Sequence, residues 1–388
     1  ALKFILLNLL LFIALARFSL VFTNDNLIYI VPFCILPLVI RSFYDLRLAL
    51  FIYTIAIVLI GWLAPNPFHF VFVQLMAGIL SILTIDNLYK RSDLFFSVGK
   101  IALVYFLSYL GISLITKGDV FGHDYSVYFF LVISALLTLF TYPLVYVYEK
   151  LFSLVSDISL LELSDTNHPL LKEMSEKAPG TFHHSLQVCN LAEYAAMEIQ
   201  GNVLLIRAGA LYHDIGKMDN ALFFIENQMA GVNPHDELSS DESAKMIISH
   251  VIRGVEKAKK HNLPEQVIDF IRTHHGEGVV QYFYREYVKK FPEMMNDTDK
   301  FRYPGPKPFS KETAILMMAD SVEAATRSLA DKNAENITEL VHKIIQGQMT
   351  QGQFEQADIT LKEINIIKKA FIKKLLSMHH LRIEYPSI

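Results

Sequence analysis

The sequence contains only two cysteines, Cys34 and Cys189, among its 388 residues. Two cysteines are too few for a disulfide framework or for a metal site built from thiolates. Cys34 lies inside an apolar run and Cys189 lies on a predicted helix, so we expect both to be small buried side chains. The sequence therefore argues against a disulfide-rich fold and against a structural zinc site made of cysteines.

An excess of positive charge is also lacking, because 35 Lys and Arg residues face 39 Asp and Glu residues. A net charge of -4 without a broad basic signature does not suggest a nucleic acid polymer as a partner. The chain begins at Ala1 without a Met or a basic segment that leads to a cleavage site. We therefore expect no signal peptide, and we interpret the sequence as a fragment of a longer protein.

Apolar residues, in contrast, make up 52% of the chain, and nearly all of the excess lies before residue 150. Most of the apolar runs there approach the roughly 20 residues that cross a hydrocarbon core. The run at 28–41 is short and contains Pro32 and Pro37, so it is predicted to be kinked or incomplete, with a re-entrant segment as the alternative. We predict a transmembrane region in contact with lipid over residues 1–148, with six helices at 1–22, 28–41, 47–64, 69–86, 98–116 and 127–148.

Basic residues between the apolar runs predict the orientation of this region. Arg41 and Arg47 flank the loop between the second and third runs, and Lys90 and Arg91 lie in the loop between the fourth and fifth. Lys150 follows the last run. The other loops, at 23–26, 64–68 and 117–126, contain one Lys and no Arg. Because basic residues are enriched in cytoplasmic loops, both ends of the chain are predicted to lie in the cytoplasm.

The remainder of the chain is predicted to be helical. Leu151, Leu154, Ile158 and Leu161 recur at spacings of three and four, which predicts one continuous amphipathic helix as a linker over 149–166. The same stripe would suit a homodimer seam, and two heptads are too few to decide. From 167 to 388 the composition is that of a soluble domain without strand-like alternation or repeats. The expected fold class is all-α, a polytopic transmembrane helix bundle followed by a cytoplasmic helical domain.

Histidine and carboxylate residues recur along this second region in a way that structural needs do not explain. An imidazole and a carboxylate are adjacent in Gly209-Ala-Leu-Tyr-His-Asp-Ile-Gly-Lys217. A single histidine on an apolar face is more often a hydrogen-bonded core residue, but a whole group is not explained in that way. The group comprises His184, His213, Asp214, His250, His274, His275 and Asp320.

Helical periodicity selects among these residues. His184 shares its helix face with Val188 and Leu191, whereas the neighbouring His183 shares its face with Gln187, so His184 is predicted to point into the core. Asp320 follows Leu316 and Met317 on an otherwise apolar face, where a carboxylate needs a partner, and a cation is the most general one. Ser239 and Ser310 are predicted to cap the helices that carry His250 and Asp320.

Imidazole nitrogens combined with carboxylate oxygens suit Fe, Mn, Zn or Co. Seven ligands are too many for one ion and suffice for two, with one carboxylate as a bridge. Two ions about 3.5–4 Å apart can clamp an attacking hydroxide and a phosphoryl oxygen. The sequence therefore predicts a phosphodiester hydrolase.

The order of these residues resembles that of the HD-domain phosphohydrolases. The text around them is similar to the PgpH-type membrane HD proteins, which are bacterial cyclic di-AMP phosphodiesterases, and the resemblance covers essentially the whole chain. It rests on Ala178-Pro-Gly-Thr-Phe-His-His-Ser185, Phe224-Ile-Glu-Asn-Gln228, Asn233-Pro-His-Asp236, Phe301-Arg-Tyr-Pro-Gly-Pro-Lys-Pro308 and Asp320-Ser-Val-Glu-Ala-Ala325.

The resemblance implies a role for each residue that matches the family motif. One metal would be bound by His184, His213 and Asp320, and the other by His250, His274 and His275, with Asp214 as the bridge. The two divalent ions would be Fe or Mn. Lys217 would face a phosphate oxygen. The alternative is that Lys217 is a solvent-exposed lysine at the end of a helix. Weaker candidates for substrate contacts are Asn227, Gln228, His235 and Arg327.

The same resemblance implies a bacterial inner membrane protein whose HD domain lies at 167–388 in the cytoplasm and cleaves cyclic di-AMP to linear pApA. The family also has an extracytoplasmic domain and a further first helix, which are missing here, so an external ligand would act through that missing domain. Alternatives are hydrolysis of cyclic di-GMP or an alarmone, and a receptor that binds a nucleotide without turnover. The Gly-Tyr-Pro motif of cyclic di-GMP enzymes is absent after His274-His275, and mononuclear HD enzymes would not need His250, His274 and His275.

Overall fold

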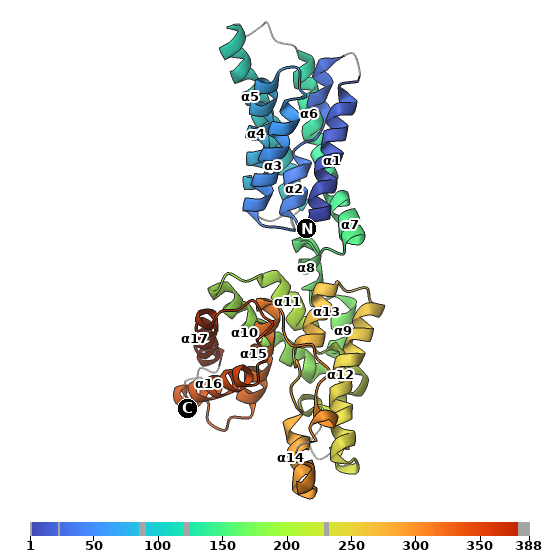
Figure 1. Cartoon of the computed structure of the whole chain (residues 1–388), viewed down its shortest axis with the longest axis vertical. Helices are drawn as coiled ribbons and strands as arrows, with labels where there is room; N and C mark the ends of the chain where they lie inside the picture. The colour runs from blue at the N-terminus through green and yellow to red at the C-terminus, as the bar shows by residue number, and fades with distance from the viewer. Residues whose placement is uncertain are drawn as a thin grey trace, which may run out of the picture. The chain divides into compact units, whose positions relative to one another are not determined.

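The computed structural model describes residues 2–21, 24–84, 91–118, 125–228, 233–295 and 297–378. The chain divides into two compact units, Ala1–Ser159 and Leu160–Ile388. The described residues are helical and contain no strand, only an isolated bridge between Val279 and Arg302. The all-α fold class is therefore confirmed (Figure 1).

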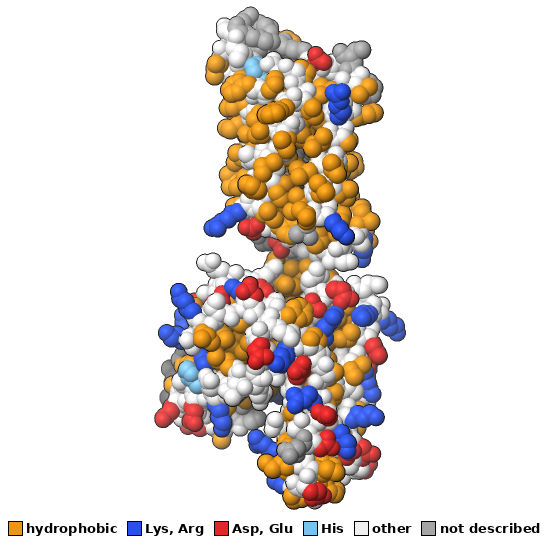
Figure 2. Space-filling model, viewed as in Figure 1, with side chains coloured by type: hydrophobic (Ala, Val, Ile, Leu, Met, Phe, Trp, Pro, Cys, Tyr) orange, Lys and Arg blue, Asp and Glu red, His pale blue; other side chains and the backbone are white. Residues whose placement is uncertain are grey.

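The first unit is a helix bundle with an apolar surface. It contains α1 (Leu2–Ser19), η1 (Asp25–Ile30), α2 (Ile35–Arg41), α3 (Leu46–Gly61), α4 (Pro67–Thr84), α5 (Arg91–Lys117), α6 (Tyr125–Leu137), η2 (Thr138–Phe140) and α7 (Thr141–Phe152). On α1, Phe4, Phe12 and Ala16 are buried at spacings of four and eight, while Leu6 and Leu10 are more than half exposed. Hydrophobic side chains cover the face of this unit seen in Figure 2. An apolar outer face suits lipid as the surrounding solvent.

The helices of this unit differ in length from the six expected crossings. Among the residues that the structure describes, three helical stretches are long and apolar enough to cross a membrane: Leu2–Ser19, Phe95–Thr116 and Tyr125–Phe152. Two more, Leu46–Gly61 and Pro67–Leu83, are apolar but shorter. The segment 28–41 is not one helix, because η1 ends at Ile30 and α2 begins at Ile35. Pro32 cannot donate a helical hydrogen bond, which gives a reason for the interruption.

The predicted continuous linker helix over 149–166 is wrong. Helix α7 ends at Phe152, and Ser153 adopts a left-handed conformation with φ 51°. The next helix, α8 (Asp157–Leu163), begins four residues later. The Glu149 carboxylate accepts hydrogen bonds from the Ser156 amide at 2.9 Å and the Ser159 hydroxyl at 2.7 Å, so side-chain bonding to the backbone competes with helix here.

The second unit is built from helices that pack around α10. Its elements are α9 (Pro169–Lys177), α10 (Pro179–Glu198), α11 (Val203–Tyr212), η3 (Ile215–Phe223), η4 (Ile225–Asn227), η5 (Pro234–Glu237), α12 (Ser240–Lys260), α13 (Glu265–Thr273), α14 (Gln281–Lys290), η6 (Pro292–Met294), η7 (Asp299–Phe301), α15 (Lys311–Arg327), α16 (Ala334–Thr350) and α17 (Leu361–Met378). Helix α10 packs against α11, α15 and α17, and α12 packs against η3 and α13. Helices α11 and α13 also pack against each other and against α15, so the elements that carry or flank the site residues meet in one core.

The predicted caps are confirmed. The Ser239 hydroxyl accepts from the Glu242 amide, and the Glu242 side chain accepts from the Ser239 amide, which closes a capping box at the start of α12. Ser310 caps α15 through the Thr313 amide at 3.1 Å. These caps set where the helices that carry His250 and Asp320 begin, and so fix the position of both side chains along the helix axes.

Candidate metal centre

All seven predicted ligand residues lie close together in the core of the second unit. His184 lies in α10, His213 and Asp214 join α11 to η3, His250 lies in α12, His274 and His275 follow α13, and Asp320 lies in α15. Six of the seven are buried, and the His275 side chain is 26% exposed. His183 is exposed while His184 is buried, as the periodicity predicts. His275 is therefore the group through which solvent can reach the cluster.

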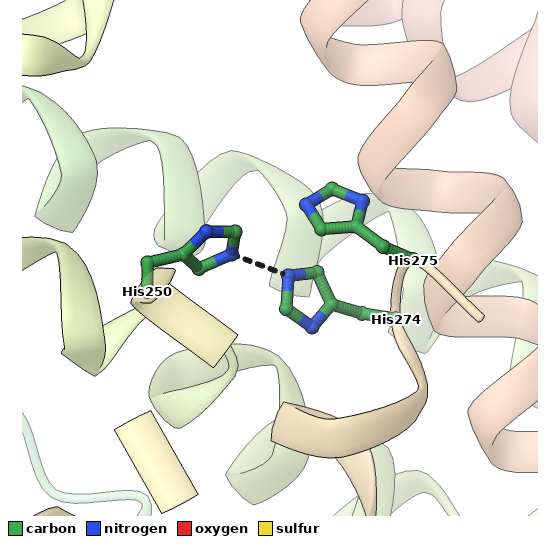
Figure 3. A group of neighbouring side chains, drawn as sticks. All are labelled: His250, His274 and His275. Atoms are coloured by element: carbon green, nitrogen blue, oxygen red, sulfur yellow. Dashed lines mark hydrogen bonds between the residues drawn. The ribbon is translucent and has the colours of Figure 1, made fainter. Parts of the chain in front are cut away.

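The nitrogen and oxygen atoms of these residues form two groups of three. Potential ligand atoms of His250, His274 and His275 all lie within 4.8 Å of one another (Figure 3). The same limit holds for His184, His213 and Asp320. We call these the triple-histidine group and the mixed group. Each has the number and type of donors that hold one transition-metal ion.

Backbone carbonyl groups orient three of the imidazoles. The Nδ1 atoms of His213, His250 and His274 each donate to the carbonyl three residues earlier, at 2.7, 2.6 and 2.8 Å. Since a carbonyl oxygen only accepts, each Nδ1 carries a proton, and Nε2 is the ring nitrogen that faces the site as a possible metal ligand. This arrangement fixes the tautomer that a metal-binding histidine requires.

The Nε2 atoms of two of these histidines, His250 and His274, face each other. The Nε2 atoms of His250 and His274 are 3.1 Å apart, the contact drawn dashed in Figure 3. Burial is the main cause that lowers the pKa of His250, to about 3, so its ring is neutral at pH 7. Two acceptor nitrogens at this distance repel each other, and a cation bound to both would remove the repulsion. Metal–nitrogen bonds of about 2.1 Å allow two ligand atoms of one ion to lie this close.

Asp214 lies between the two groups. Its Oδ1 is 3.4 Å from His250 Nε2 and 3.6 Å from His274 Nε2. Its Oδ2 is 3.3 Å from His213 Nε2 and 3.7 Å from His184 Nε2. Both oxygens are buried, and Oδ2 also forms an ion pair with Lys217 Nζ at 2.7 Å. One oxygen thus faces each group, which is the arrangement of a carboxylate that bridges two cations.

The charges of the mixed group compensate one another. His184 Nε2 is 2.9 Å from Asp320 Oδ1, and its Nδ1 is bonded to the Glu323 carboxylate. Burial lowers the pKa of His184, but the bonds to Asp320 and Glu323 raise it more, to about 9. Burial raises the pKa of Asp320, and His184 and His213 hold it well below the usual range all the same. A metal ion bound at Nε2 would replace the proton of His184.

A close helix contact holds the two halves of the site together. A Cβ atom at Gly216 would lie 1.9 Å from the His250 carbonyl oxygen and 2.6 Å from the Gly254 nitrogen. Only a glycine lets η3 approach the backbone of α12 so closely. The spacing His213-Asp214-Ile-Gly216 therefore brings Asp214 up against His250.

Lys217 points into the site and is held from two sides. Its Nζ is 2.7 Å from Asp214 Oδ2 and 3.0 Å from Glu226 Oε1, and it lies 4.9 Å from the centre of the Phe224 ring. Burial lowers the pKa of Lys217, but Asp214 and Glu226 raise it above its ordinary value. The ammonium group is charged and fixed beside the Asp214 carboxylate. A solvated helix end is not what the structure shows for this residue.

The weaker sequence candidates lie outside the two groups. Asn227 serves as a cap: its Oδ1 accepts from the Gly180 and Thr181 amides at 2.8 and 3.2 Å, and its Nδ2 donates to Thr181. Gln228 donates to Asn233 at 3.3 Å. His235 Nε2 donates to the Phe223 carbonyl at 2.9 Å, and Arg327 is exposed at the end of α15.

Three residues near the site escaped the sequence analysis. Glu323 lies three residues after Asp320, a helical spacing that could have revealed it. Glu226 holds Lys217 and also accepts from the Thr181 hydroxyl at 3.2 Å. The Tyr303 ring stacks on His275 with centres 4.2 Å apart. Glu226 and Tyr303 left no local signal, because their partners come from other elements.

Comparison with known proteins gives matches over both units. Residues 1–156 match the family model "7TM receptor with intracellular HD hydrolase", and residues 181–325 match the HD domain model. The cyclic-di-AMP phosphodiesterase PgpH of Listeria monocytogenes is 39% identical over 324 residues, which is 80% of this chain and 44% of that protein. Its Bacillus subtilis counterpart is 44% identical over 239 residues, or 62% of this chain and 33% of that protein.

A solved structure also matches. The crystal structure of the L. monocytogenes PgpH HD domain in complex with cyclic-di-AMP has a TM-score of 0.54 and 44% sequence identity. The match covers 55% of this chain and the whole of that domain. The chain spans less than half the length of the two curated relatives it matches.

Proposed function

Since this chain belongs to the family of 7TM receptors with an intracellular HD hydrolase domain, we propose that it is a phosphodiesterase that cleaves cyclic di-AMP to linear pApA. It is a membrane protein with an HD hydrolase domain. The observation that carries the proposal is the position of Asp214, whose Oδ1 faces the triple-histidine group and whose Oδ2 faces the mixed group. A single-metal hydrolase would have no use for the second group.

We assign His184, His213 and Asp320 to one divalent ion, and His250, His274 and His275 to the other, with Asp214 shared. Iron or manganese suits this set of imidazole and carboxylate donors. Such a pair of ions supplies a nucleophile derived from water at neutral pH and offsets the charge on the phosphoryl oxygens. The fixed Nδ1 protons of His213, His250 and His274 support the assignment.

The remaining steps fall to the protein's own groups. Lys217 lies with its charged Nζ beside Asp214, where it can neutralise a phosphoryl oxygen of the substrate. The ion pair with Glu226 holds this ammonium group in position. His275, the most exposed ligand, lies where the substrate phosphate would arrive. Together these groups bind and orient one phosphodiester bond of the cyclic dinucleotide for in-line attack.

We place the protein in the bacterial inner membrane with the HD domain in the cytoplasm. The loops that contain Arg41, Arg47, Lys90 and Arg91 would be cytoplasmic. A cytoplasmic site agrees with a substrate that is an intracellular second messenger. A membrane-anchored hydrolase can respond to events on the outer side of the membrane, and this would be the reason for joining the two units in one chain.

The test is product analysis with the purified whole chain in detergent. Cyclic di-AMP, cyclic di-GMP and a guanosine alarmone are incubated separately with the chain loaded with iron or with manganese. We expect pApA as the main product from cyclic di-AMP. If the chain binds cyclic di-AMP with two metals per chain but releases no product, it is a receptor without turnover and the proposal is wrong.

A further inference from the structure

We propose that one end of the helix bundle in the first unit contains a binding site for a small organic ammonium ion, independent of the HD domain. The site is a cavity of about 250 Å³. Its polar and aromatic lining comes from η1, from the loop between α3 and α4, and from the start of α4 and the end of α5. The residues that matter are Asp25, Asn26, Tyr29, Asn66, His69 and Tyr109.

The helix is interrupted between η1 and α2, next to the cavity, as it is at many binding sites in membrane proteins. Residues 31–34 lie between η1 and α2 without helical structure, and Val31, Phe33 and Cys34 are buried. The Val31 carbonyl accepts from the Phe33 amide at 2.9 Å and from the Ser134 hydroxyl at 3.1 Å. Irregular backbone at membrane depth is tolerated where it is buried in protein or lines a cavity. Discontinuous helices of this kind form the substrate sites of many transporters.

The chemistry of the lining selects a cation. Asp25 contributes a carboxylate that makes no salt bridge among the described residues, and the described lining contains no Lys or Arg. Tyr29 and Tyr109 also line the cavity, and their rings pack edge to face with centres 6.2 Å apart. A cavity lined by a carboxylate and by aromatic rings can bind an ammonium group through charge and cation–π attraction.

The location of the cavity gives the site a use. It opens at the end of the bundle with the loops 23–26 and 64–68, which the distribution of basic residues predicts to lie outside the membrane. A solute outside the cell could therefore reach Asp25 without crossing the bilayer. Because η1 and α2 belong to one interrupted segment, a ligand held at Asp25 contacts the same segment that ends at Arg41 near the other face. The bundle itself would then sense an external cation.

The experiment measures equilibrium binding of radiolabelled choline to the purified whole chain in lipid nanodiscs. We expect saturable binding at one site per chain, competition by putrescine, and no competition by 3,3-dimethylbutan-1-ol, the uncharged carbon analogue of choline. Equal competition by the neutral analogue would show that charge is not recognised and would overturn the proposal. Absence of saturable choline binding that putrescine displaces would overturn it as well.

Variants test whether the binding is at this site. Asp25→Asn should weaken choline binding about tenfold or more, as loss of a charged hydrogen bond does. It should leave the fold intact, because the cap of η1 is Asn24 and not Asp25. Asp25→Glu should retain binding. The matched control is Asp45→Asn, at the start of α3 near the other face, where Asn can still cap the helix. Equal choline affinity in Asp25→Asn and Asp45→Asn would refute the site.

Discussion

At the scale of single residues, the charge of Asp214 decides whether two cations can be neighbours. Divalent ions about 3.5–4 Å apart repel each other strongly in a site with little water. Asp214 is 1% exposed and places one oxygen toward each ligand group. Burial opposes its charge, yet Lys217 and His213 hold its pKa well below the ordinary value. It is therefore ionised when the site is formed.

We predict that Asp214→Asn loses at least one metal ion and that hydrolysis falls more than about a hundredfold, beyond what outer-shell changes cause. An amide has one oxygen and no charge, so it cannot serve both groups. Elemental analysis and turnover are measured side by side, with circular dichroism as the folding check. Asp219→Asn, in the same 3₁₀ segment and paired with Lys257 at 2.7 Å, is the control. Two metals and near-normal turnover in folded Asp214→Asn would disprove the bridge.

Glu226 offers a test of the role of Lys217 that leaves the ligands untouched. We predict that Glu226→Gln lowers kcat by about ten- to a hundredfold, the size of one charged hydrogen bond, because the amide removes the negative charge that pairs with Lys217 at 3.0 Å. Metal content should not change. The control is Glu193→Gln, which breaks the ion pair with Arg207 at 3.1 Å away from the site. A matching fall in metal content would mean that Glu226 only supports the fold.

At the scale of elements, the close contact between η3 and α12 keeps Asp214 next to His250. A methyl group at Gly216 would meet the His250 carbonyl and the Gly254 backbone, and backbone atoms cannot move aside as a flexible side chain can. We predict that Gly216→Ala destabilises the second unit by about 1–3 kcal/mol. It should also weaken metal binding, since His250 is pushed away from Asp214.

The matched control for this joint is Gly347→Ala in α16. A Cβ there meets no atom within 4 Å, so the change should be neutral or slightly stabilising, as Gly to Ala is within a helix. Thermal unfolding and metal titration of both variants decide the matter. If Gly216→Ala melts and binds metal as Gly347→Ala does, the close contact has no role in the site.

Features of the elements that depend on a local pattern could be predicted from the sequence, and those that depend on specific side-chain bonds could not. His184 and Asp320 were predictable because helical periodicity is a local pattern, and the caps at Ser239 and Ser310 are local as well. The break at Ser153 was not predictable, because the bonds from Glu149 to Ser156 and Ser159 outweigh an apolar stripe that favours helix. The cap that Asn227 provides to α10 was not predictable, since the amides that it accepts from lie 46 and 47 residues away.

At the scale of the whole molecule, the proposed enzyme has to distinguish adenine from guanine in its substrate. We predict that kcat/KM for cyclic di-AMP exceeds that for cyclic di-GMP by at least about tenfold, a ratio that one or two polar contacts to a base can supply. The absence of Gly-Tyr-Pro after His275 supports adenine. Both substrates are assayed at equal metal loading, and faster turnover of the guanine compound would contradict the prediction.

The two ligand groups also differ in when they can come into existence during synthesis. His250 and His274 are 24 residues apart, so the triple-histidine group is available soon after its first member leaves the ribosome. His184 and Asp320 are 136 residues apart, so the mixed group has to wait for most of the domain. Translation runs at about 5–20 residues per second, which puts seconds between the two events. The triple-histidine group could therefore bind an ion before the mixed group is complete.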